Sequence, residues 1–182
     1  MKIYLLRHEK RYDNPNFDTD LTQDGFNNAE KLKLELEKLY IDEIYVSPYK
    51  RVIQTIEPYL NLPNNWSSPR TDQFINLEYG IYESLHNDKD FKNIRELNDN
   101  LYGFKYFNKN YTSLINKDDL QMGETYNDIK ERANKFINYL IQNNNKNKNI
   151  LVVCHLSVIN AILNRDERAE FEMGKLILFY QE

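Results

Sequence analysis

The chain has 182 residues, of which 41% are hydrophobic, and it carries a formal net charge of −4. This length suits one domain over residues 1–182, and the acidic balance argues against a general binder of nucleic acids or anionic membranes, because such proteins usually carry a basic excess. The absence of a membrane-spanning apolar run or a signal-peptide pattern, together with a single cysteine that can form no internal disulfide, predicts a cytoplasmic protein without a nucleic-acid or membrane partner.

The first 60 residues alternate between strand and helix patterns. "KIYLL" at residues 2–6 combines β-branched and aromatic residues in a short run that is typical of a buried strand. Residues 21–40 predict an amphipathic helix with Thr22 as its N-cap and apolar residues at helical spacing, namely Phe26, Ala29, Leu32, Leu36 and Leu39. A strand over residues 42–47 then leads into a second helix, for which Ser47 is the expected N-cap and proline occupies the first turn.

The same alternation returns near the other end of the chain. Residues 149–154, "NILVVC", form the most strand-like run, a short helix is predicted over residues 157–163, and "KLILFY" closes with another strand. An amphipathic helix is expected over residues 125–141, with an apolar face made of Ile129, Ala133, Phe136, Ile137 and Leu140. This order predicts an α/β fold in three layers, α/β/α, around a buried and mostly parallel sheet.

Basic residues and histidines follow the predicted strands at the points where these end. Arg7, His8 and Arg11 come after the first strand, His155 follows "ILVVC", and Arg51 lies one turn inside the second helix. The carboxyl ends of parallel strands meet at one edge of a sheet, where ligands bind, and a helix N-terminus there adds free N–H groups. We therefore expect these five residues to form an anion-binding site.

A metal site is the competing use of two histidines at one edge of a sheet. The arginines and the lysine near His8, and Arg51 at the same expected edge of the sheet, would repel a metal cation. The chain also lacks the H-x-x-x-H and H-E-x-x-H spacings that place two histidines on one face of a helix. The sequence therefore favours an anion over a metal, and no metal or other cofactor is expected.

Five stretches of the sequence resemble, in order, the signatures of the histidine phosphatase superfamily, the phosphoglycerate-mutase-like enzymes. They are "LLRHEKRYDN", "LTQDG", "VSPYKRVIQT", "GETYNDIKERANKFI" and "LVVCHLSVI", which together span nearly the whole chain. The combination of an R-H pair with S-P-x-x-R-x-x-Q-T is fairly specific. An arginine three residues after the histidine resembles the phosphatases of the superfamily more than its mutases.

This resemblance implies a chemistry that fits the cluster of positive charges. His8 would be the nucleophile that takes the phosphoryl group as phosphohistidine, so that hydrolysis is split into two easier transfers. Arg7, Arg51 and His155 would bind the phosphate oxygens, with Arg11 as an additional contact, since arginine presents a fixed fork of donors to such oxygens. The implied partner is a small-molecule phosphate ester.

The proton donor for the leaving oxygen is expected in the segment "NLEYGIYE", where two glutamates fit the family's L-x-E pattern. Glu83 is preferred, because "EYGIYE" resembles the form of this motif in the phosphatases, and Glu78 is the alternative. The sequence departs from the family at Glu9, where a small residue is usual, and at Leu156, where glycine is common. A carboxylate at residue 9 would disfavour phosphate binding unless its side chain points away.

Three functions therefore stay open at this point. The first is a metal-independent phosphomonoester hydrolase with a phosphohistidine intermediate. A phosphoglycerate mutase is the alternative within the family, although mutases use longer loops to retain their bisphosphate intermediate. A catalytically silent phospho-ligand-binding module is the third. The polar, aromatic-rich region 84–120 is expected to be an insertion over the active site.

Overall fold

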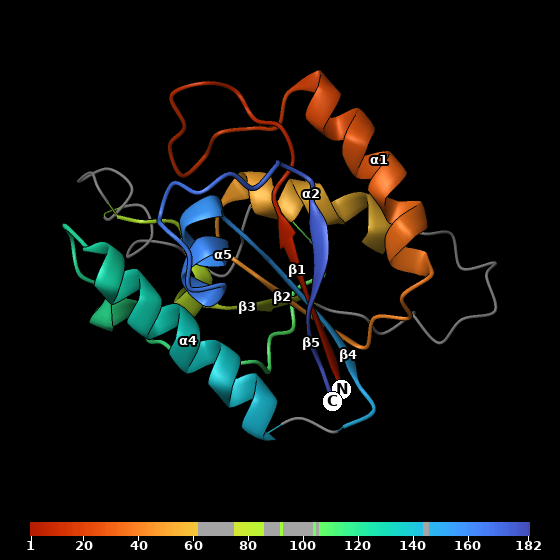
Figure 1. Cartoon of the computed structure of the whole chain (residues 1–182). Coiled ribbons are helices and arrows are strands. Elements are labelled where there is room, and N and C mark those ends of the chain that lie inside the picture. The colour runs from red at the N-terminus through yellow and green to blue at the C-terminus, as the bar shows by residue number, and fades with distance from the viewer. Residues whose placement is uncertain (62–74, 86–91, 93–103, 105, 144–145) are drawn as a thin grey trace.

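The structure is a computed structural model that describes residues 1–61, 75–85, 92, 104, 106–143 and 146–182. A five-stranded sheet with the order β3-β2-β4-β1-β5 lies between two layers of helices (Figure 1). Four strands run parallel, and the fifth pairs antiparallel with β1 at one edge. The strands are β1 (Lys2–Arg7), β2 (Glu43–Val46), β3 (Ile75–Leu77), β4 (Asn149–Cys154) and β5 (Leu176–Gln181).

The helices cover both faces of the sheet, as the sequence predicts. On one face lie α1 (Gln23–Glu37) and α2 (Lys50–Leu60), and on the other lie α4 (Tyr126–Asn143) and α5 (Leu156–Ile162). Two short 3-10 helices, η2 (Tyr79–Ile81) and η4 (Lys117–Asp119), complete the described elements. The prediction of a three-layer α/β/α fold with a mostly parallel sheet is therefore confirmed.

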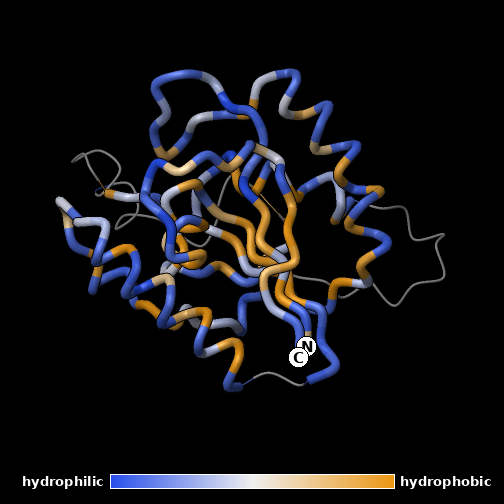
Figure 2. Tube along the Cα trace, viewed as in Figure 1, coloured by the Kyte–Doolittle hydropathy of each residue, from blue (hydrophilic) through white to orange (hydrophobic). Residues whose placement is uncertain are grey.

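Alternating strand residues build a separate apolar layer on each face of the sheet. In β1, Tyr4 and Leu6 pack with α1 and α2, whereas Ile3 and Leu5 pack with α4 and α5. This division follows from the two-residue repeat of a strand. The apolar colouring in Figure 2 accordingly concentrates on the strands and on the sides of the helices that face them.

The predicted helix starts are right in one case and wrong in another. The Thr22 hydroxyl accepts a hydrogen bond from Gly25 N at 3.1 Å and caps α1 as expected. The expectation that Ser47 caps the second helix is wrong, because α2 begins at Lys50 after Tyr49. The Ser47 hydroxyl instead lies 2.8 Å from His155 Nε2, so a residue expected to start a helix contacts a candidate functional histidine.

The "LTQDG" segment holds the chain that follows His8 against the first turn of α1. Lys10 O accepts a hydrogen bond from Thr22 N at 2.9 Å. A side chain at residue 25 would overlap this carbonyl, so only glycine permits the close approach. Gly25 therefore fixes the path of the segment that carries Arg11.

The predicted insertion at 84–120 falls largely outside the described residues, which leave out 86–91, 93–103 and 105. Its described part runs beside β3: Ile75 N donates to Tyr106 O at 2.7 Å, and Asn108 N donates to Ile75 O at 3.0 Å. Its position over the active site therefore stays a prediction. Among the described helices, none has the length and apolar character that crossing a bilayer requires.

Candidate active site

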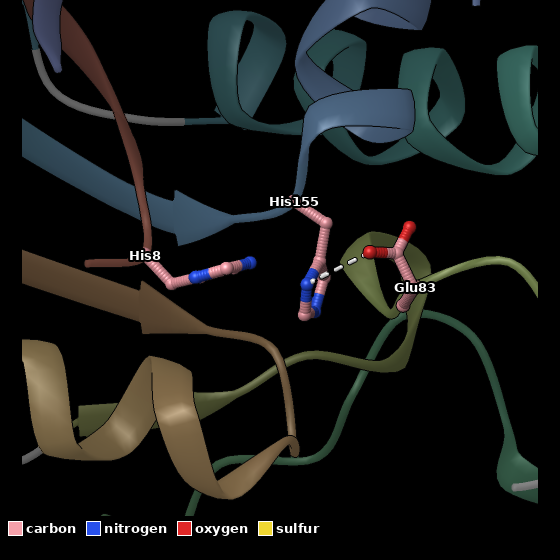
Figure 3. A group of neighbouring side chains, drawn as sticks. All are labelled: His8, Glu83 and His155. Carbon is pink, nitrogen blue, oxygen red and sulfur yellow. Dashed lines mark ion pairs between the residues drawn. The ribbon is translucent and has the colours of Figure 1, made fainter. Parts of the chain in front are cut away.

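Side chains from four strand ends and from α2 converge at one edge of the sheet. His8 follows β1 and His155 follows β4, and because Arg7 pairs with Cys154 in the parallel register of these strands, the two histidines are neighbours with ring centroids 5.3 Å apart. Glu83 arrives from the segment after β3 and η2. Figure 3 shows the side chains of His8 and Glu83 directed toward His155. The structure thus brings these three predicted residues together.

His8 is buried in a hydrogen-bonding environment that fixes its tautomer. Its Nδ1 lies 2.8 Å from the Glu9 carbonyl oxygen, which can only accept, so Nδ1 carries the proton and Nε2 keeps its lone pair. Arg51 Nε donates to this Nε2 at 3.4 Å. Burial lowers the pKa of His8 well below its usual 6.5, and the charge of Arg51 lowers it further. His8 is therefore a neutral imidazole with an available nitrogen.

His155 is fully buried and also neutral. Its Nε2 lies 2.8 Å from the Ser47 hydroxyl, and its Nδ1 lies 3.4 Å from Arg51 Nη2 and 3.3 Å from Glu83 Oε2. Burial lowers the pKa of His155 well below 6.5, with a further contribution from Arg51. Because the ring of His155 is neutral, one of its nitrogens can accept a proton and the other can donate one.

Arg51 lies between the histidines and Glu83, and its guanidinium contacts all three. It is buried, and besides its two histidine contacts its Nη2 lies 3.6 Å from Glu83 Oε2. The ligand atoms of His8, Glu83 and His155 lie within 4.8 Å of one another, a geometry that could hold a metal ion. A divalent cation among them would face the Arg51 charge at close range, so the arrangement favours an anion.

Arg7 and Arg11 add two further cations beside this group. Arg7 Nη1 donates to Phe171 O, while its buried Nε has no hydrogen-bond partner among the described residues. Burial lowers the pKa of Arg7, which the charge of Glu83 partly offsets, and nearby Arg11 and Arg51 lower it further. The guanidinium groups of Arg7, Arg11 and Arg51 repel one another, and the Arg7 Nε–H lacks an acceptor among the described residues. Such a group of cations can bind an oxyanion.

The carboxylate of Glu83 has two oxygens in different surroundings. Oε1 accepts hydrogen bonds from the Ser157 hydroxyl at 2.6 Å and from Ser84 N at 3.2 Å. Oε2 faces His155 and Arg51 at the distances given above. The side chain keeps 27% of its surface exposed, whereas His155 keeps none, so Glu83 lies where the site meets solvent.

Glu78, the alternative acid, lies in a different hydrogen-bond network. It is fully buried, and five described donors from its own segment and from residues 111–115 bind its two oxygens. Two of these are Gly80 N at 2.7 Å and Leu114 N at 3.0 Å. The structure therefore brings Glu83, and not Glu78, to the two histidines. Glu78 instead links residues 111–115 to η2 through its hydrogen bonds.

A buried ion pair that sequence reasoning missed anchors the segment just before Glu83. Arg132 binds Glu124 through two contacts of 2.6 and 3.0 Å and donates to Gly80 O at 3.0 Å. The Tyr82 hydroxyl donates to the same Glu124 carboxylate at 2.5 Å. A signal for this pair was present, because Arg132 lies on the apolar face predicted for its helix, where a charge needs a buried partner.

Glu9 directs its carboxylate toward α1 and residue 174. The carboxylate accepts hydrogen bonds from Asn28 Nδ2 at 3.3 Å and from Lys10 N at 3.2 Å. Gly174 packs directly on it with φ +74°, and a side chain there would overlap the Glu9 carboxylate. Gly174 N also donates to Arg7 O and His8 O. Glu9 thus occupies space left by a glycine while its carbonyl orients His8.

Comparison with known proteins matches residues 3–177 to the family described as the histidine phosphatase superfamily (branch 1). A relative from Schizosaccharomyces pombe, named as a probable phosphatase, is 30% identical over 169 residues, which cover 89% of this chain and 71% of the relative. The phosphoserine phosphatase of Entamoeba histolytica superposes with a TM-score of 0.63 at 17% identity, covering 98% of this chain and 90% of that one. The alpha-ribazole phosphatase of Shigella flexneri superposes with a TM-score of 0.62 at 19% identity, covering 97% of this chain and 88% of that one. At these identities the two structures establish a shared fold.

The contact between Glu9 and Gly174 predicts a specific loss of stability. Gly174→Ala should lower the free energy of unfolding by about 1–3 kcal/mol more than Gly123→Ala, because both glycines have positive φ but only a side chain at 174 meets another group. Urea unfolding of the two variants measures the difference. In a Glu9→Gly background, Gly174→Ala should lower the free energy of unfolding no more than Gly123→Ala does. Equal losses from these two substitutions in the wild-type background would contradict the assignment.

The lowered pKa values predict how the two site histidines titrate. His8 and His155 should remain neutral as the pH falls through 6.5 and should take up protons only at clearly lower pH, because burial and Arg51 oppose the charged form. NMR of the imidazole Cε1 protons, assigned with single histidine variants, follows each ring. In urea both should return to about 6.5. A midpoint near 6.5 for His8 in the folded protein would contradict this.

Proposed function

Since this chain belongs to the histidine phosphatase superfamily (branch 1), we propose that it is a metal-independent phosphomonoester hydrolase that forms a phosphohistidine on His8. The family and the relative named as a phosphatase support the general activity. The observation that carries the proposed mechanism is the state of His8. Its neutral ring presents the Nε2 lone pair to a place where three arginine side chains gather.

In the first step of the proposed reaction, a small phosphate ester binds with its oxygens among Arg7, Arg51 and His155, and Arg11 adds a further contact. In the free protein Arg51 Nε donates to the lone pair of His8 Nε2. A phosphate oxygen offers this donor a better acceptor, because it is charged, and so frees the lone pair for attack. The bond from Nε2 to phosphorus forms while the bond from phosphorus to the ester oxygen breaks.

Charge and protons must then be handled at the departing oxygen. The arginines neutralise the charge that develops on the non-bridging phosphate oxygens, which is the main demand of phosphoryl transfer. An alkoxide is a poor leaving group, and Glu83 gives it a proton from Oε2, the oxygen on the side of His155 and Arg51. The alcohol leaves, and Glu83 remains as a carboxylate.

In the second step, water attacks the phosphohistidine. Glu83 accepts a proton from this water as the bond between water oxygen and phosphorus forms and the bond from phosphorus to Nε2 breaks. His8 returns to its neutral form and inorganic phosphate is released. The same carboxyl group thus serves as acid and then as base, and no step requires a metal ion.

Two observations favour hydrolysis over the alternatives. Arg11 lies beside the site, close enough for Glu83 to influence its pKa, and an arginine at this spacing resembles the phosphatase branch. A mutase must exclude water from its phosphohistidine, whereas Glu83 is partly exposed. A silent binding module would need no particular tautomer of His8. The contact of His8 Nδ1 with a carbonyl oxygen, the lowered pKa of the ring and the nearby Glu83 carboxyl group therefore support a reactive histidine.

The nucleophile is tested by replacing His8. His8→Ala should reduce turnover to the background rate, because the ring is the proposed nucleophile. Its unfolding transition should stay close to that of the wild type. Rapid mixing with ³²P-labelled ester should trap an acid-labile, alkali-stable phosphoryl group on the wild type alone. Both assays should give the same result in excess EDTA. Turnover by the alanine variant, or loss of wild-type activity to EDTA that a divalent ion restores, would contradict the proposal.

The proton donor is tested through the leaving group. Glu83→Gln should slow hydrolysis of alkyl phosphates by about 10²–10⁴-fold, the usual contribution of a positioned acid, because an alcohol cannot leave without a proton. Nitrophenyl phosphate should be affected much less, since its phenolate departs unaided. Single-turnover rates with the two esters measure the difference. Equal losses with both esters would contradict the role of Glu83.

Glu78→Gln serves as the comparison for this experiment. It should leave the ratio of the two rates at the wild-type value but lower the free energy of unfolding by about 1–3 kcal/mol. The reason is that every partner of Glu78 is a donor, so an amide nitrogen at either position leaves a backbone N–H without an acceptor. A leaving-group-dependent loss in Glu78→Gln would instead identify Glu78 as the acid.

A further inference from the structure

Of the polar contacts that described residues make with Glu83, the proposed proton donor, the one from the Ser157 hydroxyl is the shortest. Ser157 is the second residue of α5, two positions after His155, and it is buried. Its Oγ donates to Glu83 Oε1 at 2.6 Å, across 74 residues of sequence. Ser157 lies within the stretch "LVVCHLSVI", but the resemblance assigns a role there only to His155.

The two oxygens of Glu83 cannot play the same part. A protonated carboxyl group carries its proton on one oxygen, and its carbonyl oxygen is the better acceptor. Oε1 accepts from Ser84 N, and a backbone N–H can only donate. The Ser157 hydroxyl donates to the same oxygen. With two donors at Oε1, the proton of the acid belongs on Oε2, which faces His155 and Arg51.

Ser157 also opposes the attraction between Glu83 and Arg51. Charge-assisted contacts between arginine and carboxylate are commonly about 2.7–2.9 Å long, whereas Arg51 Nη2 and Glu83 Oε2 are 3.6 Å apart. The bond from Ser157 holds the carboxylate on the side of α5. A closer ion pair would use the Arg51 guanidinium that the proposed reaction needs for phosphate.

We propose that Ser157 is a positioning residue that keeps Glu83 turned toward α5 and assigns its proton to Oε2. This inference rests on the proposed function, in which Glu83 is the proton donor. Among the described residues the Ser157 hydroxyl bonds the Glu83 carboxylate, and in the proposed reaction it makes no bond to phosphorus or to the ester oxygen. Its effect on turnover therefore passes through Glu83 alone, and this makes it separable from a general role in folding or in phosphate binding.

The experiment compares Ser157→Ala with Ser84→Ala and Ser157→Thr. Ser157→Ala should slow alkyl phosphate hydrolysis about 10- to 100-fold, the effect of losing a hydrogen bond to a charged group. Nitrophenyl phosphate should be slowed less than about threefold, with little change in KM. Ser84→Ala keeps the backbone donor and should match the wild type. Ser157→Thr keeps the hydroxyl and should recover most of the rate.

A double variant separates action through Glu83 from other effects. In the Glu83→Gln background, Ser157→Ala should cause no further loss, because the group that it positions is already gone. Equal slowing of both esters by Ser157→Ala, or an additive loss in the double variant, would overturn the inference while leaving Glu83 as the acid. If Glu83→Gln itself shows no dependence on the leaving group, the proposed proton donor fails and this inference fails with it. Thermal unfolding of each variant checks that it is folded.

Discussion

The buried charge of Arg51 is the constraint on which the site depends. Its guanidinium contacts both histidines and lies near Glu83, and it is held by a hydrogen bond to Asn16 O at 2.9 Å and by the ring of Tyr49, 4.5 Å away. This single cation helps to keep both imidazoles neutral, opposes a metal ion among the same ligands, and retains only a loose pairing with Glu83. The proposed nucleophile, the proposed anion site and the proposed independence from metal thus share one physical origin.

The fold places this charge through features that lie outside the site. Parallel pairing of β1 and β4 sets His8 beside His155, and the irregular residues after β2 bring Ser47 to His155 before α2 begins. Two glycines then let other segments close on the end of β1. Gly25 admits the chain that carries Arg11, and Gly174 admits Glu9. Glu9 is a large residue where the family usually has a small one, and Gly174 leaves space for its side chain.

The sequence predicted the parts of the site that follow directly from strand ends. His8, His155 and Arg51 could be placed together because parallel strands share one carboxyl edge. Glu83 and Glu78 could not be separated in the same way. They lie five residues apart in one segment, and their difference comes from distant partners, Ser157 for one and residues 111–115 for the other. Such pairings depend on tertiary packing, which local sequence patterns do not contain.

The same limit explains the error at Ser47 and the omission of β3. A serine before proline is a good helix cap by local rules. Here the Ser47 hydroxyl instead hydrogen-bonds the buried ring of His155. The strand β3 has three residues, too few for a periodic pattern to develop. In contrast, α1 and α4 carry enough apolar repeats for the positions of these helices to be predicted closely. The expectation that Phe26 belongs to the apolar face of α1 is wrong, because this side chain is exposed.

Two buried sets of charges in this protein differ in a way that distinguishes structure from reactivity. Glu124 and Arg132 form a close ion pair with two short contacts, and Tyr82 and the Gly80 carbonyl satisfy what remains. Such a pair is complete and holds its segment in place. At the candidate site the guanidinium groups of Arg7, Arg11 and Arg51 gather near the Glu83 carboxylate, whose contact with Arg51 is 3.6 Å long. Within the part of the chain that the structure describes, the buried Arg7 Nε has no acceptor. A folded protein tolerates this excess of positive charge most readily where an anion completes it, as the phosphate group of the proposed substrate would.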